Sequence, residues 1–378
     1  MSKRILLYYP PNKRSVAIET LCRAVKEAGH DLIVLTLTEK DSFHAQIERM
    51  GLATYTTVIN RKPSWKYFLN QARFLIGFCK KHKIDHVWSH LQEANFIAIL
   101  AQPFIKARVT TFRHHAESAF YAEYGNQFGM TRNSREELLD KIINRLAKTI
   151  VVPSSGVWYG MEKYESCNMK KVLLLPYIYD FCSYQTPNYK LVKQLRSTFS
   201  CELLLIMVSR MIESKQHQPV FEVLHKLKEE GLKIKMIVMD DGPLKAQLEN
   251  FTIEKGMTDD IIFVGFKTDF INYMAAADLL IHPSLTEASS NVVKEMGLIN
   301  KTVAVCEGVG DFNDYIVNGK NGFVISRLQL SEGIEAAIRK AYTNSELLKD
   351  MGENLHQSVV ELFSESQENR NRFLDLIT

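Results

Sequence analysis

The sequence predicts an α/β protein with two doubly wound domains, each a parallel sheet covered by helices. Short apolar segments alternate with longer amphipathic ones along the chain, which is typical of repeated β-α-β units. The chain has 378 residues, too many for one ordinary core and about right for two domains. Its 46% hydrophobic and 24% charged residues are ordinary for a globular protein. We expect the domains to face each other across a cleft, with ligand at the carboxyl ends of the strands.

The first domain is expected to span residues 1–182. It begins with a buried strand over 5–9, a loop over 10–15 and a helix over 16–28, followed by a strand over 31–37. The same alternation predicts later strands over 84–88, 108–112, 149–154 and 172–175, and a helix over 93–100.

A polar, broken stretch over 182–187 indicates a linker, so the second domain is expected to span 183–360. The last segment, 361–378, is expected to form a polar helix. The elements predicted for the second domain are strands over 202–208, 235–239, 261–264, 279–282 and 302–305, and helices over 219–230, 244–255 and 270–276 and after Glu287.

Composition indicates a reduced cytoplasmic setting. The six cysteines are scattered without a C-x-x-C pair, so neither a disulfide framework nor a zinc site is expected. No apolar run approaches the roughly 20 residues needed to span a bilayer. The short apolar run at the N-terminus is broken by Pro10 too early for a signal peptide.

The net charge of +4 conceals an asymmetry between the two halves. Residues 1–175 contain about 26 Lys and Arg against about 15 Asp and Glu, a surplus near +11, which leaves about −7 for the rest. Such a basic half favours an anionic partner, and we expect peripheral contact with the inner face of an anionic membrane. Nucleic acid is not expected, because no recognition motif accompanies the charge.

Glu287 and Glu295 are eight residues apart around the start of a predicted helix. The polar turn before that helix should place Glu287 in a loop and Glu295 about two turns inside the helix. Backbone N–H groups at a helix start can hold a diphosphate, and carboxylates can accept hydrogen bonds from sugar hydroxyls. Two glutamates at this spacing are also common on helix surfaces, so the spacing alone leaves both interpretations open.

Further segments accompany these glutamates in a fixed order. They are Val208-Ser209-Arg210 with Lys215, the turn over 239–244, the strand end over 263–266, the strand over 275–284 and the segment over 314–324. Together they resemble the retaining glycosyltransferases of the GT-B fold, the large family 4 (glycosyl transferases group 1). The resemblance covers residues 203–325 and implies two Rossmann-like domains, with the final helix crossing back to the first.

The resemblance implies a donor site in the second domain. Arg210 and Lys215 would bind the diphosphate and stabilise its growing charge as the sugar leaves. Glu287 would contact the donor sugar, and Glu295 the ribose hydroxyls. Asp240 stands where the family has a glycine, and a carboxylate there would repel a diphosphate if it pointed inward. The further donor-binding residues implied are Gly242, Phe266, Ser289, Ser290, Asn291 and Val292.

On the acceptor side, the resemblance places His115 beside the reacting centre, with His114 and His90 as further candidates. The first loop lacks the Gly-Gly pair usual in the family. Lys13 or Arg14 is therefore expected to contact the acceptor through its side chain.

The implied function is retaining transfer of a sugar from a nucleotide-sugar, with UDP favoured, to a saccharide or lipid-linked acceptor in surface polysaccharide or glycolipid synthesis. The catalytic candidates are His115, Arg210, Lys215 and Glu287. No cofactor and no metal are expected, because no Asp-x-Asp motif stands in a suitable setting and two cations can replace the ion. A nucleotide-sugar epimerase, an inverting transferase and a silent nucleotide-sugar-binding protein remain alternatives.

Overall fold

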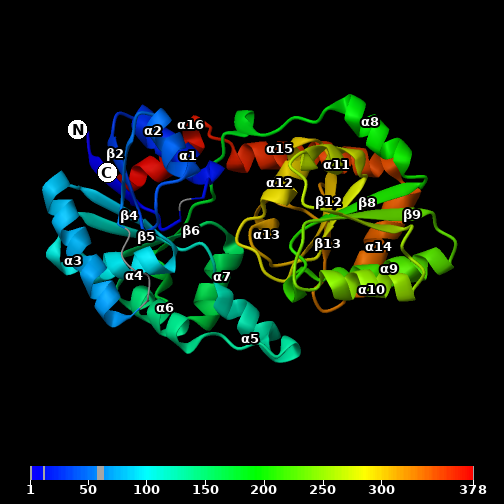
Figure 1. Ribbon diagram of the computed structural model, residues 1–378, viewed down its shortest axis with the longest axis horizontal. Helices are drawn as coiled ribbons and strands as arrows, with labels where there is room; N and C mark the ends of the chain where they lie inside the picture. The colour runs from blue at the N-terminus through cyan, green and yellow to red at the C-terminus, as the bar shows by residue number, and fades with distance from the viewer. Residues whose placement is uncertain (1, 12, 58–63, 378) are drawn as a thin grey trace. The chain divides into compact units, whose positions relative to one another are not determined.

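The computed structural model describes residues 2–11, 13–57 and 64–377, which fold into two compact units (Figure 1). The first unit contains Met1–Cys182 and Phe363–Thr378, and the second contains Ser183–Leu362. Each unit has its own parallel sheet and its own buried apolar core. None of the helices described in the structure is long and apolar enough to cross a membrane.

Over its described residues, the first unit forms a seven-stranded sheet in the order β3-β2-β1-β4-β5-β6-β7. All of these strands pair in parallel, for example Ile5 with Leu32 on one side and with His86 on the other. The strand order reverses between β1 and β4. The strands are β1 (Arg4–Tyr8), β2 (Asp31–Thr36), β3 (Ala53–Thr56), β4 (His86–His90), β5 (Arg108–Phe112), β6 (Thr149–Val152) and β7 (Val172–Leu174).

Helices cover both faces of this sheet, with α1, α2 and α16 on one face and α3, α4 and α6 on the other (Figure 1). Burial on both faces explains why β1 and β2 are almost continuously apolar after their first residue. The helices are α1 (Val16–Glu27), α2 (Ser42–Arg49), α3 (Trp65–His82), α4 (Leu91–Ala101), α5 (Glu117–Phe128), α6 (Ser134–Leu146), α7 (Ser155–Tyr164) and α16 (Gln367–Leu374).

The last helix, α16, belongs to the core of the first unit. Phe373 is buried in the same apolar cluster as α1, and Arg370 forms an ion pair with Glu27 over 2.5 Å. Arg23 of α1 pairs with Glu365 at 2.9 Å, just before α16. Apolar burial and two ion pairs therefore hold the end of the chain against α1.

The second unit has a six-stranded sheet in its described residues, in the order β10-β9-β8-β11-β12-β13. The order reverses between β8 and β11. The strands are β8 (Leu203–Val208), β9 (Ile234–Met239), β10 (Ile261–Gly265), β11 (Leu279–His282), β12 (Thr302–Cys306) and β13 (Phe323–Ile325). The helices are α8 (Tyr189–Thr198), α9 (His217–Glu229), α10 (Lys245–Glu254), α11 (Phe270–Ala276), α12 (Asn291–Leu298), α13 (Phe312–Tyr315), α14 (Leu330–Thr343) and α15 (Ser345–Phe363).

The predicted fold class is confirmed, since both units are parallel α/β sheets covered by helices. One element differs from its predicted form. The polar helix expected over 361–378 is interrupted, because α15 ends at Phe363 and α16 begins only at Gln367. The side chain of Ser366 accepts a hydrogen bond from the Asn369 N–H over 3.3 Å and caps the new helix.

Candidate functional site

The candidate donor site lies where the strand order of the second sheet reverses. Sheets of this kind commonly bind ligands at the carboxyl ends of the strands on either side of such a point. Lys215 follows β8 at the end of a single 3-10 turn, and Glu287 follows β11. The backbone N–H of Leu285 donates to the Ser214 carbonyl over 2.8 Å and links the two segments. The fold therefore brings together two residues that lie 72 positions apart.

Lys215 and Glu287 form an ion pair through Lys215 Nζ and Glu287 Oε1. The same ammonium donates to the Ser284 hydroxyl over 3.2 Å, and His282 Nε2 lies 2.9 Å from Glu287 Oε1. Burial raises the pKa of Glu287, but the hydrogen bond and charge of His282 and the charge of Lys215 outweigh it and lower the pKa to about 2. Glu287 is therefore an ionised hydrogen-bond acceptor at neutral pH.

Two histidines that the sequence analysis did not single out flank this pair. His282 is the last residue of β11, and His217 is the first residue of α9. Both are buried, and His217 Nε2 lies 3.4 Å from the Ser209 hydroxyl. Burial, followed by the charges of His282 and Lys215, lowers the pKa of His217 to about 4. The only sequence signal for His282 is a polar residue that ends an apolar strand.

Glu295 lies about one turn inside α12, rather than the two turns predicted, because the segment before Asn291 is not helical. Burial raises the pKa of Glu295 to about 7, while the charge of Lys294 lowers it. Ser290 is buried at the N-cap position of α12, and Asn291 is exposed. Residues 288–290 and the first turn of α12 therefore separate the two glutamates.

The turn after β9 packs tightly against the loop after β8. A Cβ atom on Gly242 would lie 2.4 Å from the Met211 carbonyl oxygen and 2.7 Å from the Met211 nitrogen, so only glycine fits. Asp240, where the family has a glycine, adopts a φ of +92°, which glycine favours. Its side chain accepts a hydrogen bond from the Asp241 N–H over 2.9 Å. The structure thus gives Gly242 a packing role, and Asp240 keeps a glycine-like backbone.

The other predicted donor residues lie around the same strand ends. Arg210 is exposed after β8, and Phe266 is 76% exposed after β10. Val292 is half-buried in the first turn of α12, and the Ser289 hydroxyl donates to the Asp311 carboxylate over 2.6 Å. Lys215, Glu287 and Ser289 therefore make close polar contacts, whereas Arg210 and Phe266 offer exposed side chains.

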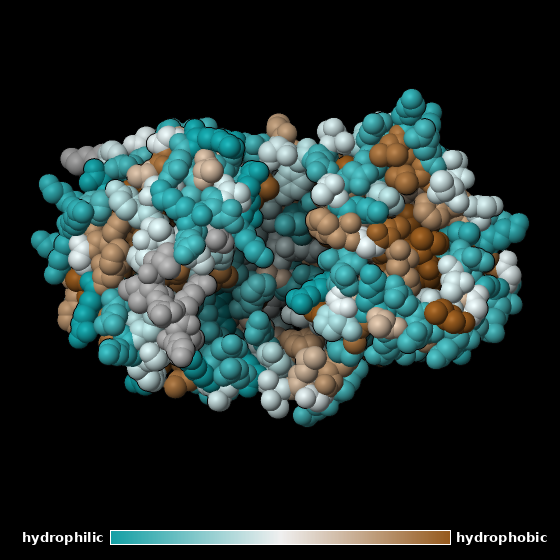
Figure 2. Space-filling view, viewed as in Figure 1, coloured by the Kyte–Doolittle hydropathy of each residue, from teal (hydrophilic) through white to brown (hydrophobic). Residues whose placement is uncertain are grey.

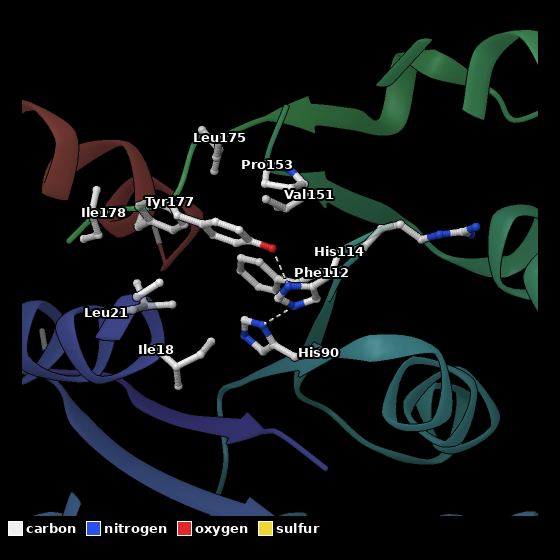
Figure 3. Close-up of a pocket in the computed structure, with 13 residues that line it drawn as sticks. Ile18, Leu21, His90, Phe112, His114, Val151, Pro153, Leu175, Tyr177 and Ile178 are labelled. Carbon is white, nitrogen blue, oxygen red and sulfur yellow. Dashed lines mark hydrogen bonds between the residues drawn. The ribbon is translucent and has the colours of Figure 1, made fainter. Parts of the chain in front are cut away.

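In the first unit, His90 and His114 form a hydrogen-bonded line with Tyr177 (Figure 3). His90 Nδ1 lies 3.1 Å from His114 Nε2, and the Tyr177 hydroxyl contacts His114 Nδ1. The His90 ring stacks on Phe112 with centroids 4.3 Å apart. Burial is the main cause that lowers the pKa of His90, and it lowers that of His114 to about 3, so both rings are neutral at pH 7.

This line borders a small apolar pocket at the carboxyl ends of β5 and β6 (Figure 3). Ile18 and Leu21 of α1 and Phe373 of α16 contribute to its wall. The buried nitrogen His90 Nε2 has no hydrogen-bond partner among the described residues. The contact of Tyr177 with His114 was not predicted from the sequence.

The remaining acceptor candidates lie elsewhere on the first unit. His115 is exposed and lines a neighbouring polar pocket with Gln92 and Glu136. Lys13 is exposed, whereas Arg14 donates to the Glu19 carboxylate from Nε over 2.9 Å and from Nη2 over 2.7 Å. The structure thus joins His90 to His114 but turns His115 towards solvent.

Arg113 forms a buried ionic cluster between these histidines and the helices of the first unit. Its Nη2 lies 2.8 Å from Asp140 and 2.7 Å from Glu165, and its Nε donates to the His115 carbonyl over 2.8 Å. Arg132 also contacts Asp140. Over the described residues, no group of three or more His, Cys, Asp or Glu side chains is arranged to hold a metal ion.

Two known families match consecutive parts of the chain. Residues 15–163 match the family described as Glycosyltransferase Family 4. Residues 196–358 match the family described as Glycosyl transferases group 1. The two matches fall on the first and second units respectively.

The chain is also similar to individual glycosyltransferases. The chain is 24% identical over 327 residues to alpha-monoglucosyldiacylglycerol synthase of Streptococcus pneumoniae, covering 82% of this chain and 70% of that protein. It is 34% identical over 121 residues to lipopolysaccharide glucosyltransferase WaaG of Escherichia coli, or 31% of each chain.

Solved structures resemble both units. Anabaena Alr3699/HepE in complex with UDP-glucose aligns over 99% of both chains, with a TM-score of 0.77 and 16% identity. A glycosyltransferase from Rickettsia africae covers 100% of this chain and 98% of its own, with a TM-score of 0.79 and 19% identity. These structures support the GT-B fold.

Proposed function

Because the chain belongs to the family 4 (group 1) glycosyltransferases, we propose that it transfers a sugar from a nucleotide-sugar to a saccharide or lipid-linked acceptor, with retention of configuration. The observation that carries this proposal is the Lys215–Glu287 pair beside the start of α12. A cation, an ionised carboxylate and the free N–H groups of a helix start are the groups that a diphosphate-linked sugar needs.

We favour a UDP-sugar as donor. The similar HepE structure contains UDP-glucose. In the proposed complex, Lys215 and Arg210 bind the diphosphate and stabilise the charge that grows as the glycosidic bond breaks. Glu287 accepts hydrogen bonds from the sugar, and Glu295 does so from the ribose. Among the described residues, Glu287 Oε2 has no partner, so one carboxylate oxygen is open to a sugar hydroxyl.

The acceptor is proposed to bind the first unit. His115 remains the candidate for the reacting centre. Lys13, an exposed cation in the loop after β1, remains a candidate for acceptor binding. Since the pKa values of His90 and His114 are lowered, these two residues would act as neutral hydrogen-bonding groups.

A donor screen followed by product analysis tests this function. We expect a UDP-sugar to raise the melting temperature of the purified protein in proportion to the logarithm of its concentration. NMR of the product should then show that the transferred sugar keeps its anomeric configuration. A product with inverted configuration would support the inverting transferase. Epimers of the donor at C2 or C4 would support the epimerase. Binding without turnover on any acceptor would support the silent nucleotide-sugar-binding protein.

The raised pKa of Glu295 predicts a pH dependence of donor binding. Only the ionised carboxylate is a strong acceptor for ribose hydroxyls, and with a pKa of about 7 its ionised fraction rises steeply between pH 6 and 8. The KM for the nucleotide-sugar should therefore fall by up to about tenfold over this range. Steady-state kinetics with the sugar-linked donor measure this, because its diphosphate has no titrating group in the window.

Glu295→Gln should remove this dependence, since an amide does not titrate. Glu332→Gln, at an exposed position on α14, is the matched control and should keep it. A KM for Glu295→Gln that still falls with pH would assign the titration to another group.

We also propose that the first unit binds an anionic membrane surface through α3. This helix exposes Trp65 (56%), Leu69 (47%) and Phe74 (40%), with Trp65 and Leu69 one turn apart. Lys66, Arg73, Lys80 and Lys81 are exposed on the same helix. Figure 2 shows hydrophobic and hydrophilic surface side by side in this region. Exposed apolar side chains among cations suit the interface of an anionic bilayer.

Co-sedimentation with vesicles tests this surface. We expect binding to vesicles with phosphatidylglycerol, weak binding to pure phosphatidylcholine, and at least about a fivefold loss of affinity in Trp65→Ser/Leu69→Ser. Ile253→Ser, at a 65% exposed apolar position on α10, is the control. Equal binding by the α3 variant and the control would show that α3 does not contact the membrane.

A further inference from the structure

Lys294 precedes Glu295 in α12, but its side chain is fully buried in the second unit. Its Nζ lies 2.7 Å from Asp311 Oδ2, and both side chains have 0% exposure. A lysine is almost never fully buried unless it is paired. This pair lies directly beneath the loop that carries Glu287.

The Lys294 ammonium uses its hydrogens to join three points of two loops. Besides Asp311, it donates to the Ser289 hydroxyl over 2.7 Å and to the Ser290 carbonyl over 3.2 Å. The Ser289 hydroxyl in turn donates to the same Asp311 oxygen over 2.6 Å. The loop that links β11 to α12 is thereby bound to the loop that follows β12.

The same two loops also touch at the backbone. A Cβ atom on Gly310 would lie 2.9 Å from Glu287 Cβ and 3.2 Å from the Ala288 carbonyl oxygen. Gly310 also adopts a φ of +55°, which side chains disfavour. Glu287 is therefore confined by Gly310 on one side, while Lys294 and Asp311 fix the residues that follow it.

A buried ion pair is weak evidence for stability, because removing two charges from water offsets most of their attraction. Its better supported effect is to specify one geometry. Here every polar contact of Lys294 named above falls on Asp311 or on Ser289 and Ser290, two of the three residues between Glu287 and α12.

We propose that Lys294 is a positioning residue: together with Asp311 it fixes the loop over 287–290, and so sets the place of the Glu287 carboxylate against the donor sugar. This inference rests on the proposed function, because it assumes that Glu287 contacts the donor. Lys294 itself touches no substrate. Burial lowers the pKa of Lys294, and the charge of Asp311 raises it. Glu287 and Glu295 raise it by smaller amounts, so the charge of Lys294 also interacts with both glutamates.

The test replaces both partners, since Lys294→Met alone would leave a buried unpaired carboxylate. Lys294→Met/Asp311→Leu should fold and bind UDP within about threefold of the wild-type affinity, because the diphosphate contacts remain. Its kcat with the UDP-sugar should fall at least about tenfold, because Glu287 loses its fixed position. The pH dependence of the donor KM should also shift upward, because Glu295 loses a cation that lowers its pKa.

Lys301→Met is the matched control. Lys301 is a half-buried lysine close to α12, but its Nζ donates to the Ala277 carbonyl over 2.7 Å, away from the Glu287 loop. It should keep the wild-type kcat. If the double variant does not fold, Ser289→Ala retains the ion pair and removes one link. Because Asp311 and Lys294 already engage the Ser289 hydroxyl, a donor contact of Ser289 would use its backbone N–H, so kcat should fall about threefold at unchanged UDP affinity.

The inference is overturned, and the pair is purely structural, if the folded double variant has a wild-type kcat and an unshifted pH profile. If the double variant does not fold, a wild-type kcat in Ser289→Ala has the same meaning. The proposed function fails by a different result. If the wild-type protein neither binds UDP nor turns over any nucleotide-sugar, the function is overturned, and the inference with it.

Discussion

Lys215→Met should lower kcat/KM for sugar transfer by about 10²–10³, and Glu287→Gln should have a loss of similar size. Lys215 is the cation that the fold places against Glu287 at the reversal point of the second sheet. In the proposed reaction, it stabilises charge on the leaving diphosphate, a contact that strengthens in the transition state. Most of its loss should therefore appear in kcat rather than in KM.

Glu287→Gln removes the charge while keeping the shape. The wild-type carboxylate is ionised at neutral pH, because His282 and Lys215 lower its pKa to about 2 despite its burial. The amide would leave Lys215 without its anion in a buried setting and would be a weaker acceptor for sugar hydroxyls. Initial rates with a saturating acceptor, measured against donor concentration, give both constants.

Matched controls separate chemistry from folding. Lys320→Met and Glu332→Gln remove the same charges at exposed positions of the second unit and should keep at least half of the wild-type rate. Circular dichroism should show that all four variants are folded. If Lys215→Met and Glu287→Gln retain nearly normal rates, the reacting centre is not at this pair.

The meeting of Lys215 with Glu287 was predictable because parallel strands place their carboxyl ends at one edge of a sheet, whatever the distance along the chain. The resemblance to the family then indicated that these two residues share one donor site. His282 and His217 were not predictable in this way. Their effect on the site comes from burial and from side-chain direction, and a single histidine in the sequence reveals neither.

Lys294 shows the same limit more clearly. Beside Glu295 on a predicted helix it looks like a surface charge, and only Asp311, 17 residues later, makes its burial tolerable. In α3, which the sequence analysis did not assign, apolar residues occupy the exposed side as well as the buried side. This distribution blurs the 3.6-residue periodicity on which helix prediction depends.

The acceptor side was harder to predict because it depends on local turns. The strand over 108–112 was expected and occurs as β5, but the order of His114 and His115 after it does not reveal which ring turns inward. The structure joins His114 to His90 and Tyr177, and Arg113 fixes this turn through the His115 carbonyl. The assignment of His115 to the reacting centre stays a prediction.

Arg113→Met should have the largest effect on stability, a loss of about 3–5 kcal/mol in the free energy of unfolding of the first unit. Arg113 is 7% exposed and lies between two buried carboxylates, Asp140 and Glu165. After the substitution, Asp140 keeps Arg132, but Glu165 retains only neutral donors, Ser118 at 2.6 Å and Asn144 at 2.7 Å. A buried carboxylate without a cation is costly, and this accounts for the loss.

Urea unfolding followed by tryptophan fluorescence measures this effect in the right unit, because Trp65, Trp88 and Trp158 all belong to the first unit. Arg108→Met, at the exposed first residue of β5, the strand that directly precedes Arg113, should change the midpoint little. Adding Glu165→Leu to Arg113→Met should recover part of the loss, since it removes the carboxylate that lost its cation. Equal midpoints for Arg113→Met and Arg108→Met would mean that hydration or rearrangement of Glu165 replaces the guanidinium at little cost.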